Sequence, residues 1–439
     1  MHQYMQRVYD EVKARNPHEK LFLQTVEEVF ESLEPIVEKN AELYEKYGVL
    51  ERMCEPDRMI QFRVTWADDN GMPHVNRGFR VQFNSAIGPY KGGLRFASDV
   101  TLDTMKFLGF EQTFKNSLTS LPLGGGKGGS DFSPIGKSDA EVMRFCQAFM
   151  TELWRHIGPD VDVPAGDIGV GGREIGYLYG QYKRIKAVWE NGVLTGKGFS
   201  YGGSLIRPEA TGYGAVYYLV EVLKHFGETI EGKRIAISGY GNVGWGIMKK
   251  AAQLGAKVTY FAGPDGYIHD PDGVTGEKLD FILEMRAKDP MHCKPYADKY
   301  GVEFVPGTKC WGVKDVDIIM PAATQNDSGV KYYIEVANMP TTNEALAMLR
   351  KCEHITVAPS KAVNAGGVAT SGFEMSQNSM RYSWTAEEVD ERLKVTMKNI
   401  YAASVEAAEK AGLGYDLVAG GNIAGFLRVA DAMIAQGLV

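Results

Sequence analysis

Three lysines in the first half of the chain stand where an amine could meet a substrate. Lys127 lies among five glycines in LPLGGGKGGSDF (121–132), Lys91 lies in GPYKGGLRF, and Lys115 lies in a helical pattern. Glycines let a backbone approach a ligand closely, and burial beside other cations lowers the pKa of an amine. Such an amine can bind a carboxylate or transfer a proton. The alternative is a flexible surface loop with solvated lysines.

A carboxylate in the same half of the chain could share the proton transfer. Asp167 follows Gly166 in DVPAGDIGVGG. A positioned carboxylate can move a proton to and from a substrate amine, whereas an aspartate in a glycine-rich turn can also serve only to form the turn. The spacing alone leaves both interpretations open.

A second glycine motif has the sequence context of a dinucleotide-binding fold. The segment KRIAISGYGNVGWGIMKKAAQLGAKVTYFAGPDG contains a β-rich run, a G-x-G-x-x-G turn, a helical stretch and a second β-rich run. An aspartate follows 21 residues after the last glycine of the turn, near the place where an acidic residue binds a ribose hydroxyl. A structural turn is the alternative. The predicted cofactor-binding residues are Gly239, Gly241, Asn242, Val243, Gly244 and Asp265.

The elements that must position the lysines mix strands and helices. Two alternating runs flank Asp69-Asn70-Gly71 and predict an antiparallel hairpin. The stretches 101–118 and 139–157 have helical patterns. Thr25 and Glu28 have the spacing of a capping box, which predicts that a helix begins there.

After about residue 200, short β-rich runs alternate with helical stretches or turns, which predicts a parallel sheet flanked by helices. Thr385 is spaced to begin a long helix that ends at Gly412. We therefore predict an α/β protein with two domains, residues 1–200 and 201–414, divided near 198–206, and a C-terminal helix in 415–439 that packs back on the first domain. The β-rich runs are 233–238, 257–262, 316–320, 332–337 and 354–358.

Composition narrows the possible functions. The 439 residues carry a net charge of −7, which gives no general reason to bind nucleic acid or an anionic membrane. The five cysteines include no C-x-x-C pair, so free thiols in a reducing cytosol are expected rather than disulfides or a zinc site. The histidine spacing predicts no metal site, and we find neither a signal core nor an apolar stretch of membrane-spanning length. A cytoplasmic location is expected.

Six segments of the chain resemble glutamate dehydrogenases of the hexameric, bacterial type, in the Glu/Leu/Phe/Val dehydrogenase family. They are VQFNSAIGPYKGGLRF, PLGGGKGGSDF, DVPAGDIGVGGREIGY, RPEATGYG, VAPSKAVNAGGV and SGFEMSQNSM. The resemblance implies reversible oxidative deamination of L-glutamate to 2-oxoglutarate and ammonia, with hydride transfer to NAD or NADP. It also implies a homohexamer, with substrate binding and oligomerisation in the first domain and a Rossmann-type NAD(P)-binding second domain.

The resemblance further implies roles for single residues. Lys127 matches the catalytic lysine, and Asp167 matches the acid/base carboxylate. The residues that match substrate contacts are Lys115 and Gln112 for the α-carboxylate, Lys91 and Ser371 for the γ-carboxylate, and the backbone of Gly166. The residues that match cofactor contacts are Thr211 and Asn242, with Asn338 and Asn364 beside the nicotinamide.

Cofactor choice and one connection distinguish this chain within the family. Pro264 and Asp265 offer no cation for a 2′-phosphate, which favours NAD over NADP. The connection DSGVK (327–331) is shorter than the helix-containing connection of relatives, a change that affects the nucleotide domain around Thr324 and Asn326 rather than the chemistry of the lysines.

Two other functions must be weighed against glutamate dehydrogenation. A dehydrogenase for an apolar amino acid would share Lys127 and Asp167, but it would not need Lys91 and Ser371 for a second carboxylate. A non-catalytic nucleotide-binding sensor should have lost Lys127 or Asp167. The chain contains all four residues, which favours glutamate dehydrogenation over both.

Overall fold

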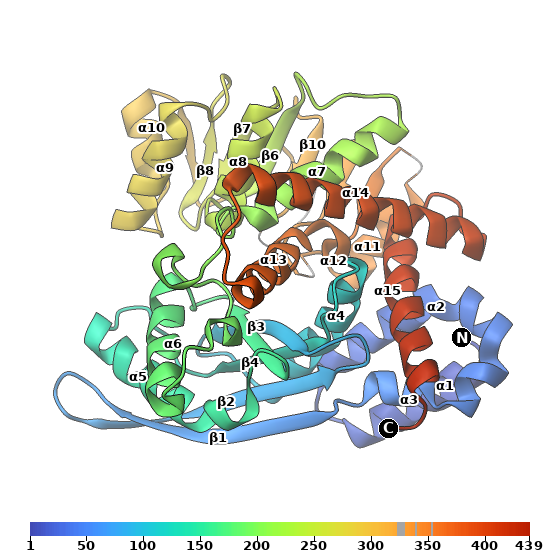
Figure 1. Cartoon of the computed structure of the whole chain (residues 1–439). Helices are drawn as coiled ribbons and strands as arrows, with labels where there is room; N and C mark the ends of the chain where they lie inside the picture. The colour runs from blue at the N-terminus through green and yellow to red at the C-terminus, as the bar shows by residue number, and fades with distance from the viewer. Residues whose placement is uncertain (323–329, 339, 353) are drawn as a thin grey trace.

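The structure is a computed structural model that describes residues 1–322, 330–338, 340–352 and 354–439. The described strands form two sheets, a five-stranded sheet in the first half of the chain and a seven-stranded sheet in the second. Figure 1 shows the two sheets in the lower and upper parts of the molecule, with α13 and α4 between them. This arrangement is the two-domain α/β fold that the sequence predicts.

The first sheet has the strand order β1-β2-β4-β3-β5. β1 and β2 form the predicted antiparallel hairpin, in which Trp66 pairs with His74 and Gly71 in the turn has a φ of 77°. β4 runs antiparallel to β2 and parallel to β3, and β5 is parallel to β3. The strands are β1 (Arg58–Ala67), β2 (Pro73–Asn84), β3 (Tyr90–Phe96), β4 (Gly125–Ser130) and β5 (Asp162–Gly166).

The glycine-rich segment around Lys127 is β4, a buried central strand, so the alternative of a flexible surface loop is wrong. A Cβ atom on Gly125 would lie 2.0 Å from Thr113 Oγ1, and one on Gly129 would lie 2.3 Å from the carbonyl oxygen of Arg95. The glycines therefore allow the neighbouring helix and strand to approach the β4 backbone closely. Local composition did not reveal this packing, because glycine is normally unfavourable in a strand.

The N-terminal helices surround this sheet, and one begins earlier than predicted. The helix α2 starts at Lys20, and Thr25 is an interior residue whose hydroxyl donates to the carbonyl of Leu21. Asp103 accepts hydrogen bonds from the first amides of α2 instead, at 3.2 Å from Leu21 N and 2.9 Å from Phe22 N. The helical elements are α1 (Gln3–Arg15), α2 (Lys20–Lys46), α3 (Val49–Cys54), α4 (Leu102–Leu118), α5 (Asp139–Leu153), η1 (Trp154–His156), α6 (Gly172–Lys186), η2 (Asn191–Val193) and η3 (Phe199–Tyr201).

The second sheet has the strand order β12-β11-β10-β6-β7-β8-β9. The five predicted β-rich runs are confirmed as the parallel strands β12 to β7 of this order. Two short antiparallel edge strands, β8 and β9, were not predicted. The strands are β6 (Arg234–Ser238), β7 (Lys257–Ala262), β8 (Gly266–His269), β9 (Glu303–Pro306), β10 (Ile318–Met320), β11 (Tyr332–Ile334) and β12 (Thr356–Ala358).

Helices of the second half pack around this parallel sheet. The predicted capping box at Thr385 and the left-handed Gly412 (φ 80°) bound α14 as expected. The helices are α7 (Ala210–His225), α8 (Asn242–Gln253), α9 (Glu277–Lys288), α10 (Lys294–Tyr300), α11 (Asn343–Lys351), α12 (Ser360–Val363), α13 (Gly366–Met380) and α14 (Ala386–Ala411).

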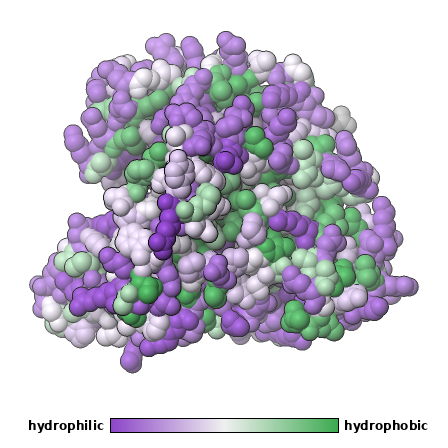
Figure 2. Space-filling model, in the orientation of Figure 1, coloured by the Kyte–Doolittle hydropathy of each residue, from purple (hydrophilic) through white to green (hydrophobic). Residues whose placement is uncertain are grey.

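The last helix, α15 (Leu417–Gln436), returns to pack on α2 and α4 of the first half. Among the described helices, α15 alone has the length and apolar composition that could cross a membrane, but 67% of its apolar window is buried in the protein, as in a core helix. Figure 2 shows hydrophilic side chains spread over both parts of the viewed face, with hydrophobic side chains gathered where the two parts meet.

Candidate active site

A cavity of about 530 Å³ separates the first sheet and α4 from the nucleotide-side elements α7, α8 and α13. It brings together eleven of the residues singled out from the sequence. From the first half come Lys91, Gln112, Lys115, Lys127, Gly166 and Asp167, and from the second half come Thr211, Val243, Asn338, Asn364 and Ser371.

Lys127 and Asp167 form an ion pair on the cavity wall. The Nζ atom of Lys127 lies 3.1 Å from Asp167 Oδ1, and the other carboxylate oxygen accepts a 2.8 Å hydrogen bond from Arg95 Nε. Lys127 is 3% exposed, and the Asp167 side chain is 20% exposed. β4 and the end of β5 fix the two backbones, so the amine and the carboxylate meet across the sheet.

Burial and local charge displace the pKa values of both members of this pair. Burial lowers the pKa of Lys127, the Asp167 carboxylate opposes this, and the Arg95 guanidinium lowers it further. Burial favours neutral Asp167, but the charges of Lys127 and Arg95 outweigh it and hold the pKa of Asp167 well below its usual range. Asp167 is therefore an anion at neutral pH, and a neutral Lys127 amine is easier to form than in water.

The end of the cavity at β3 and α13 is cationic. Lys91 is 1% exposed, and burial lowers its pKa well below the usual range, with further lowering by the charges of Arg207 and Arg80. Arg207 also lines the cavity, and its Nε atom donates a 2.9 Å hydrogen bond to Ser371 Oγ. A carboxylate bound here could accept hydrogen bonds from Lys91, Arg207 and Ser371, and its charge would favour the protonated form of Lys91.

Hydrogen bonds join α4 to the nucleotide side across the cavity. Lys115 Nζ and Asn364 Nδ2 both donate to Asn338 Oδ1, each over 2.8 Å. Burial lowers the pKa of Lys115 to about 8. Within the described residues, the buried Oδ1 atom of Asn364 has no hydrogen-bond partner, so it is available to a ligand donor. Gln112 lies one turn before Lys115 and donates to Asn116 Oδ1 over 2.7 Å.

The dinucleotide fingerprint has the three glycine geometries that a pyrophosphate site needs. Gly239 has a φ of 82°, a Cβ atom on Gly241 would have no atom within 4 Å, and one on Gly244 would lie 2.2 Å from the carbonyl oxygen of Gly239. The turn leads directly into α8, which begins at Asn242. Val243 reaches the cavity, whereas these three glycines and Asn242 are not among its lining residues.

Asp265 lies beyond β7 and outside the cavity lining. Both of its carboxylate oxygens accept from the amide of Cys293 over 3.0 Å, and one accepts from the amide of Lys294 over 3.3 Å. Opposing the effect of burial, these hydrogen bonds lower the pKa of Asp265. The side chain is thus held as an anion at the nucleotide end of the fold.

Sequence reasoning missed Arg95 and Arg207 as site residues. Arg95 follows Lys91 by four positions, so both side chains lie on the same face of β3. The two-residue alternation of side chains along a strand could therefore have identified Arg95. The pairing of Arg207 with Ser371 depends on tertiary contact and could not be predicted in this way. The segment around Thr324 and Asn326, including most of the shortened connection 327–331, lies outside the described residues.

Neither half of the described chain contains a group of three or more His, Cys, Asp or Glu side chains that could hold a metal ion.

The fold and the cavity define a two-domain α/β protein with a dinucleotide fingerprint and a lysine–aspartate site. Residues 202–437 match the family described as glutamate/leucine/phenylalanine/valine dehydrogenase, and residues 56–184 match its dimerisation domain. The chain belongs to the Glu/Leu/Phe/Val dehydrogenase family.

Full-length similarity extends this result. The chain is 63% identical to the NAD-specific glutamate dehydrogenase of Clostridium symbiosum, with 100% of both chains covered. A solved glutamate dehydrogenase structure matches with a TM-score of 0.97, 63% identity and 99% coverage of each chain. A hetero-hexameric glutamate dehydrogenase from Thermus thermophilus matches with a TM-score of 0.83 and 26% identity, over 96% of this chain and 98% of that chain.

Proposed function

We propose that the protein catalyses the reversible oxidative deamination of L-glutamate to 2-oxoglutarate and ammonia, with hydride transfer to NAD. One observation carries the proposal: a single cavity joins the Lys127–Asp167 pair to a cationic end formed by Lys91, Arg207 and Ser371. The cationic end suits the second carboxylate of glutamate. An apolar amino acid would offer no acceptor to the buried donors Lys91, Arg207 and Ser371, which is unfavourable.

The described residues fit NAD. The open space at Gly241 allows a pyrophosphate to approach the N-terminus of α8. The anionic Asp265 suits a ribose hydroxyl and disfavours a 2′-phosphate, which supports NAD over NADP. We assign further cofactor contacts to Thr211 and Asn242, and nicotinamide contacts to Asn338 and the unpartnered amide oxygen of Asn364. Bound NAD would accept the hydride released from the substrate α-carbon.

The chain's own groups would bind the substrate at both ends. Lys115 and Gln112 would hold the α-carboxylate, and the backbone of Gly166 would contact the substrate. Lys91 and Ser371 would hold the γ-carboxylate. Two fixed carboxylates leave the α-carbon little freedom, and such positioning supplies a large part of enzymatic rate enhancement.

Lys127 and Asp167 would move the protons. Loss of hydride from the α-carbon leaves an iminium, which water attacks. A neutral Lys127 amine would accept a proton from that water, which its lowered pKa favours. Asp167 would first take a proton from the substrate ammonium and would later return it to the amine of the water adduct. Expulsion of ammonia, with transfer of the hydroxyl proton of the adduct to Asp167, would then give 2-oxoglutarate.

Assembly, location and domain motion complete the proposal. We propose a homohexamer in the cytoplasm, in line with the family resemblance. We also propose that residues 1–200 form the substrate-binding domain, with 415–439 packed on it, and that residues 201–414 form the nucleotide-binding domain. Closure of the two domains would exclude water from the cavity between them.

Cofactor-dependent kinetics test the proposal. Purified protein with L-glutamate and NAD is expected to form NADH, measured by absorbance, with a higher kcat/KM for NAD than for NADP. L-Leucine serves as the matched substrate without a second carboxylate and is expected to react far more slowly. NADH formation that favoured leucine would contradict the assignment of Lys91 and Ser371, and cofactor binding without turnover would favour a sensor.

A further inference from the structure

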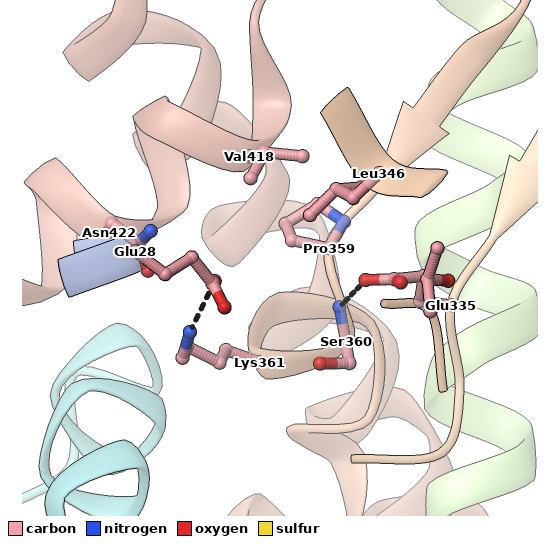
Figure 3. Close-up of a pocket in the computed structure, with 9 residues that line it drawn as sticks. Glu28, Glu335, Leu346, Pro359, Ser360, Lys361, Val418 and Asn422 are labelled. Atoms are coloured by element: carbon pink, nitrogen blue, oxygen red, sulfur yellow. Dashed lines mark hydrogen bonds and ion pairs between the residues drawn. The ribbon is translucent and has the colours of Figure 1, made fainter. Parts of the chain in front are cut away.

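A buried ion-pair cluster lies behind the active-site cavity and takes no part in the proposed chemistry. Lys361, at 6% exposure, places its Nζ atom 3.2 Å from Glu28 Oε1 and 3.3 Å from Glu111 Oε1. The three residues come from α12, α2 and α4. Figure 3 shows Glu28 and Lys361 pointing toward one another at the edge of a small cavity, with Glu335 on its other side.

The cluster joins parts of the chain that are far apart in sequence. Glu28 and Glu111 belong to the first half, whereas Lys361 belongs to the nucleotide side of the fold. The adjoining cavity has a volume of about 20 Å³, enough for a single water molecule. On its nucleotide side, Glu335 Oε2 accepts a 3.3 Å hydrogen bond from Ser360 N. Lys361 and Glu111 are therefore buried, and Glu28 is partly buried, at a junction between the two halves.

Such a cluster is costly for stability alone. Each buried charge loses its hydration, and a buried ion pair is often no more stabilising than apolar residues of the same size. Here one lysine faces two carboxylates, and Lys115 on the cavity side interacts with Glu111 as well. The unfavourable free energy of desolvation is explained if the ion pairs fix the relative position of the three helices more tightly than apolar packing would.

The position of the cluster identifies that geometry. Glu111 lies directly before Gln112 and one helical turn before Lys115, and Lys361 lies three residues before Asn364. On the cavity side, Lys115 and Asn364 meet at the side chain of Asn338. The ionic contact between Lys361 and Glu111 thus lies behind the hydrogen-bonded contact between Lys115 and Asn364.

We propose that Lys361 is a positioning residue, which holds α12 against α4 and α2 through Glu111 and Glu28. In this way it sets the place of Asn364, at the nicotinamide end, relative to Lys115, at the substrate end. The proposal rests on the proposed function, because those two ends are defined by it. A shift of about 1 Å between groups that position reactants can lower a rate by about 100-fold.

Lys361→Met tests the inference, because methionine keeps the length of the side chain and removes its charge. We expect kcat to fall by between about 10-fold and 100-fold, while the Kd for NAD changes far less. The matched control is Lys250→Met. Lys250 is also buried and ion-paired, to Asp390 at 2.9 Å, but it joins α8 to α14 within the nucleotide side, so near-normal turnover is expected.

A triple variant separates positioning from simple charge neutralisation. Replacing Lys361, Glu28 and Glu111 together by methionine removes every charge of the cluster, so the melting temperature is expected to recover relative to Lys361→Met. If Lys361 positions α12, kcat stays low in this stable variant. Recovery of wild-type kcat would overturn the proposal, because the lysine would then only neutralise two carboxylates.

Two further measurements keep the test decisive. If Lys361→Met does not fold, Glu111→Gln leaves Lys361 paired with Glu28, and an unchanged kcat in that variant would contradict the proposal. The wild-type protein is assayed alongside. Absence of NADH formation from glutamate by the wild type would refute the proposed function, whereas an active wild type with an equally active Lys361→Met would refute only the role of Lys361.

Discussion

Two glycine-rich segments look alike in sequence and solve different structural problems. In β4, a Cβ atom on Gly125, Gly128 or Gly129 would lie less than 3.0 Å from a neighbouring atom, so the glycines there allow close packing within the protein. In the fingerprint, Gly241 faces open space, so its missing side chain leaves room for a ligand. A glycine beside a functional residue is therefore not by itself evidence of a ligand-facing loop.

Burial also displaces the pKa of ionisable groups on both sides of the molecule. The substrate side holds Lys91, Lys115 and Lys127, and burial lowers the pKa of each. On the nucleotide side, burial raises the pKa of Glu335 to about 7. Desolvation favours the neutral form in every case. On the substrate side this prepares an amine for proton transfer, whereas on the nucleotide side it makes stability depend on pH.

The largest expected effect comes from removing the buried amine of Lys127 on the substrate side. Lys127→Ala removes the amine proposed to accept a proton from water, so kcat is expected to fall by about 100-fold to 10,000-fold, with a much smaller change in glutamate binding. Steady-state kinetics and a glutamate Kd measure the two effects. Lys224→Ala, on the surface of α7, is the control. Near-normal turnover of Lys127→Ala would remove the amine from the mechanism.

How far the sequence predicts this fold depends on whether a signal is local. The fingerprint and the capping box at Thr385 are local, and the structure has both where they were predicted. The capping box at Thr25 was wrong, because Asp103 from α4 satisfies the first amides of α2. A partner 81 residues from Phe22 leaves no local pattern, so propensity at Thr25 could not have located the start of α2.

The candidate site divides in the same way. Lys91, Lys127 and Asp167 could be found because glycines and a family resemblance mark their segments. Arg95 pairs with Asp167, and Arg207 pairs with Ser371, but neither pairing follows from spacing along the chain. The sequence thus predicts which groups are present in the site, whereas the tertiary fold determines which charges face one another.

A second prediction concerns the pH dependence of stability that the buried carboxyl group of Glu335 causes. Burial raises the pKa of Glu335 from its ordinary value of 4.5 to about 7 in the folded protein, so the folded state binds more protons between these pH values. Its contribution to stability is full below pH of about 4.5 and is lost as the pH rises through about 7, a change of about 3 kcal/mol. In Glu335→Gln, the free energy of unfolding should lack this loss.

Chemical denaturation of both proteins across this pH range measures the difference. The comparison with Glu335→Gln removes the contributions of other titrating groups, since they are shared by the two proteins. Glu391→Gln is the control, because its carboxylate is 67% exposed and should leave the pH profile of the wild type unchanged. Parallel profiles for wild type and Glu335→Gln would show that folding does not raise the pKa of Glu335.

The smallest expected effect tests the two uses of glycine directly. Gly129→Ala places a Cβ atom 2.3 Å from the carbonyl oxygen of Arg95, and such overpacking typically lowers the free energy of unfolding by about 1–3 kcal/mol. Gly241→Ala meets no atom within 4 Å, so its stability should match the wild type while its KM for NAD rises. Denaturation and NAD kinetics on both variants give the four values needed. Equal destabilisation by the two changes would mean that the fingerprint glycine, like those of β4, is required for packing rather than for a ligand.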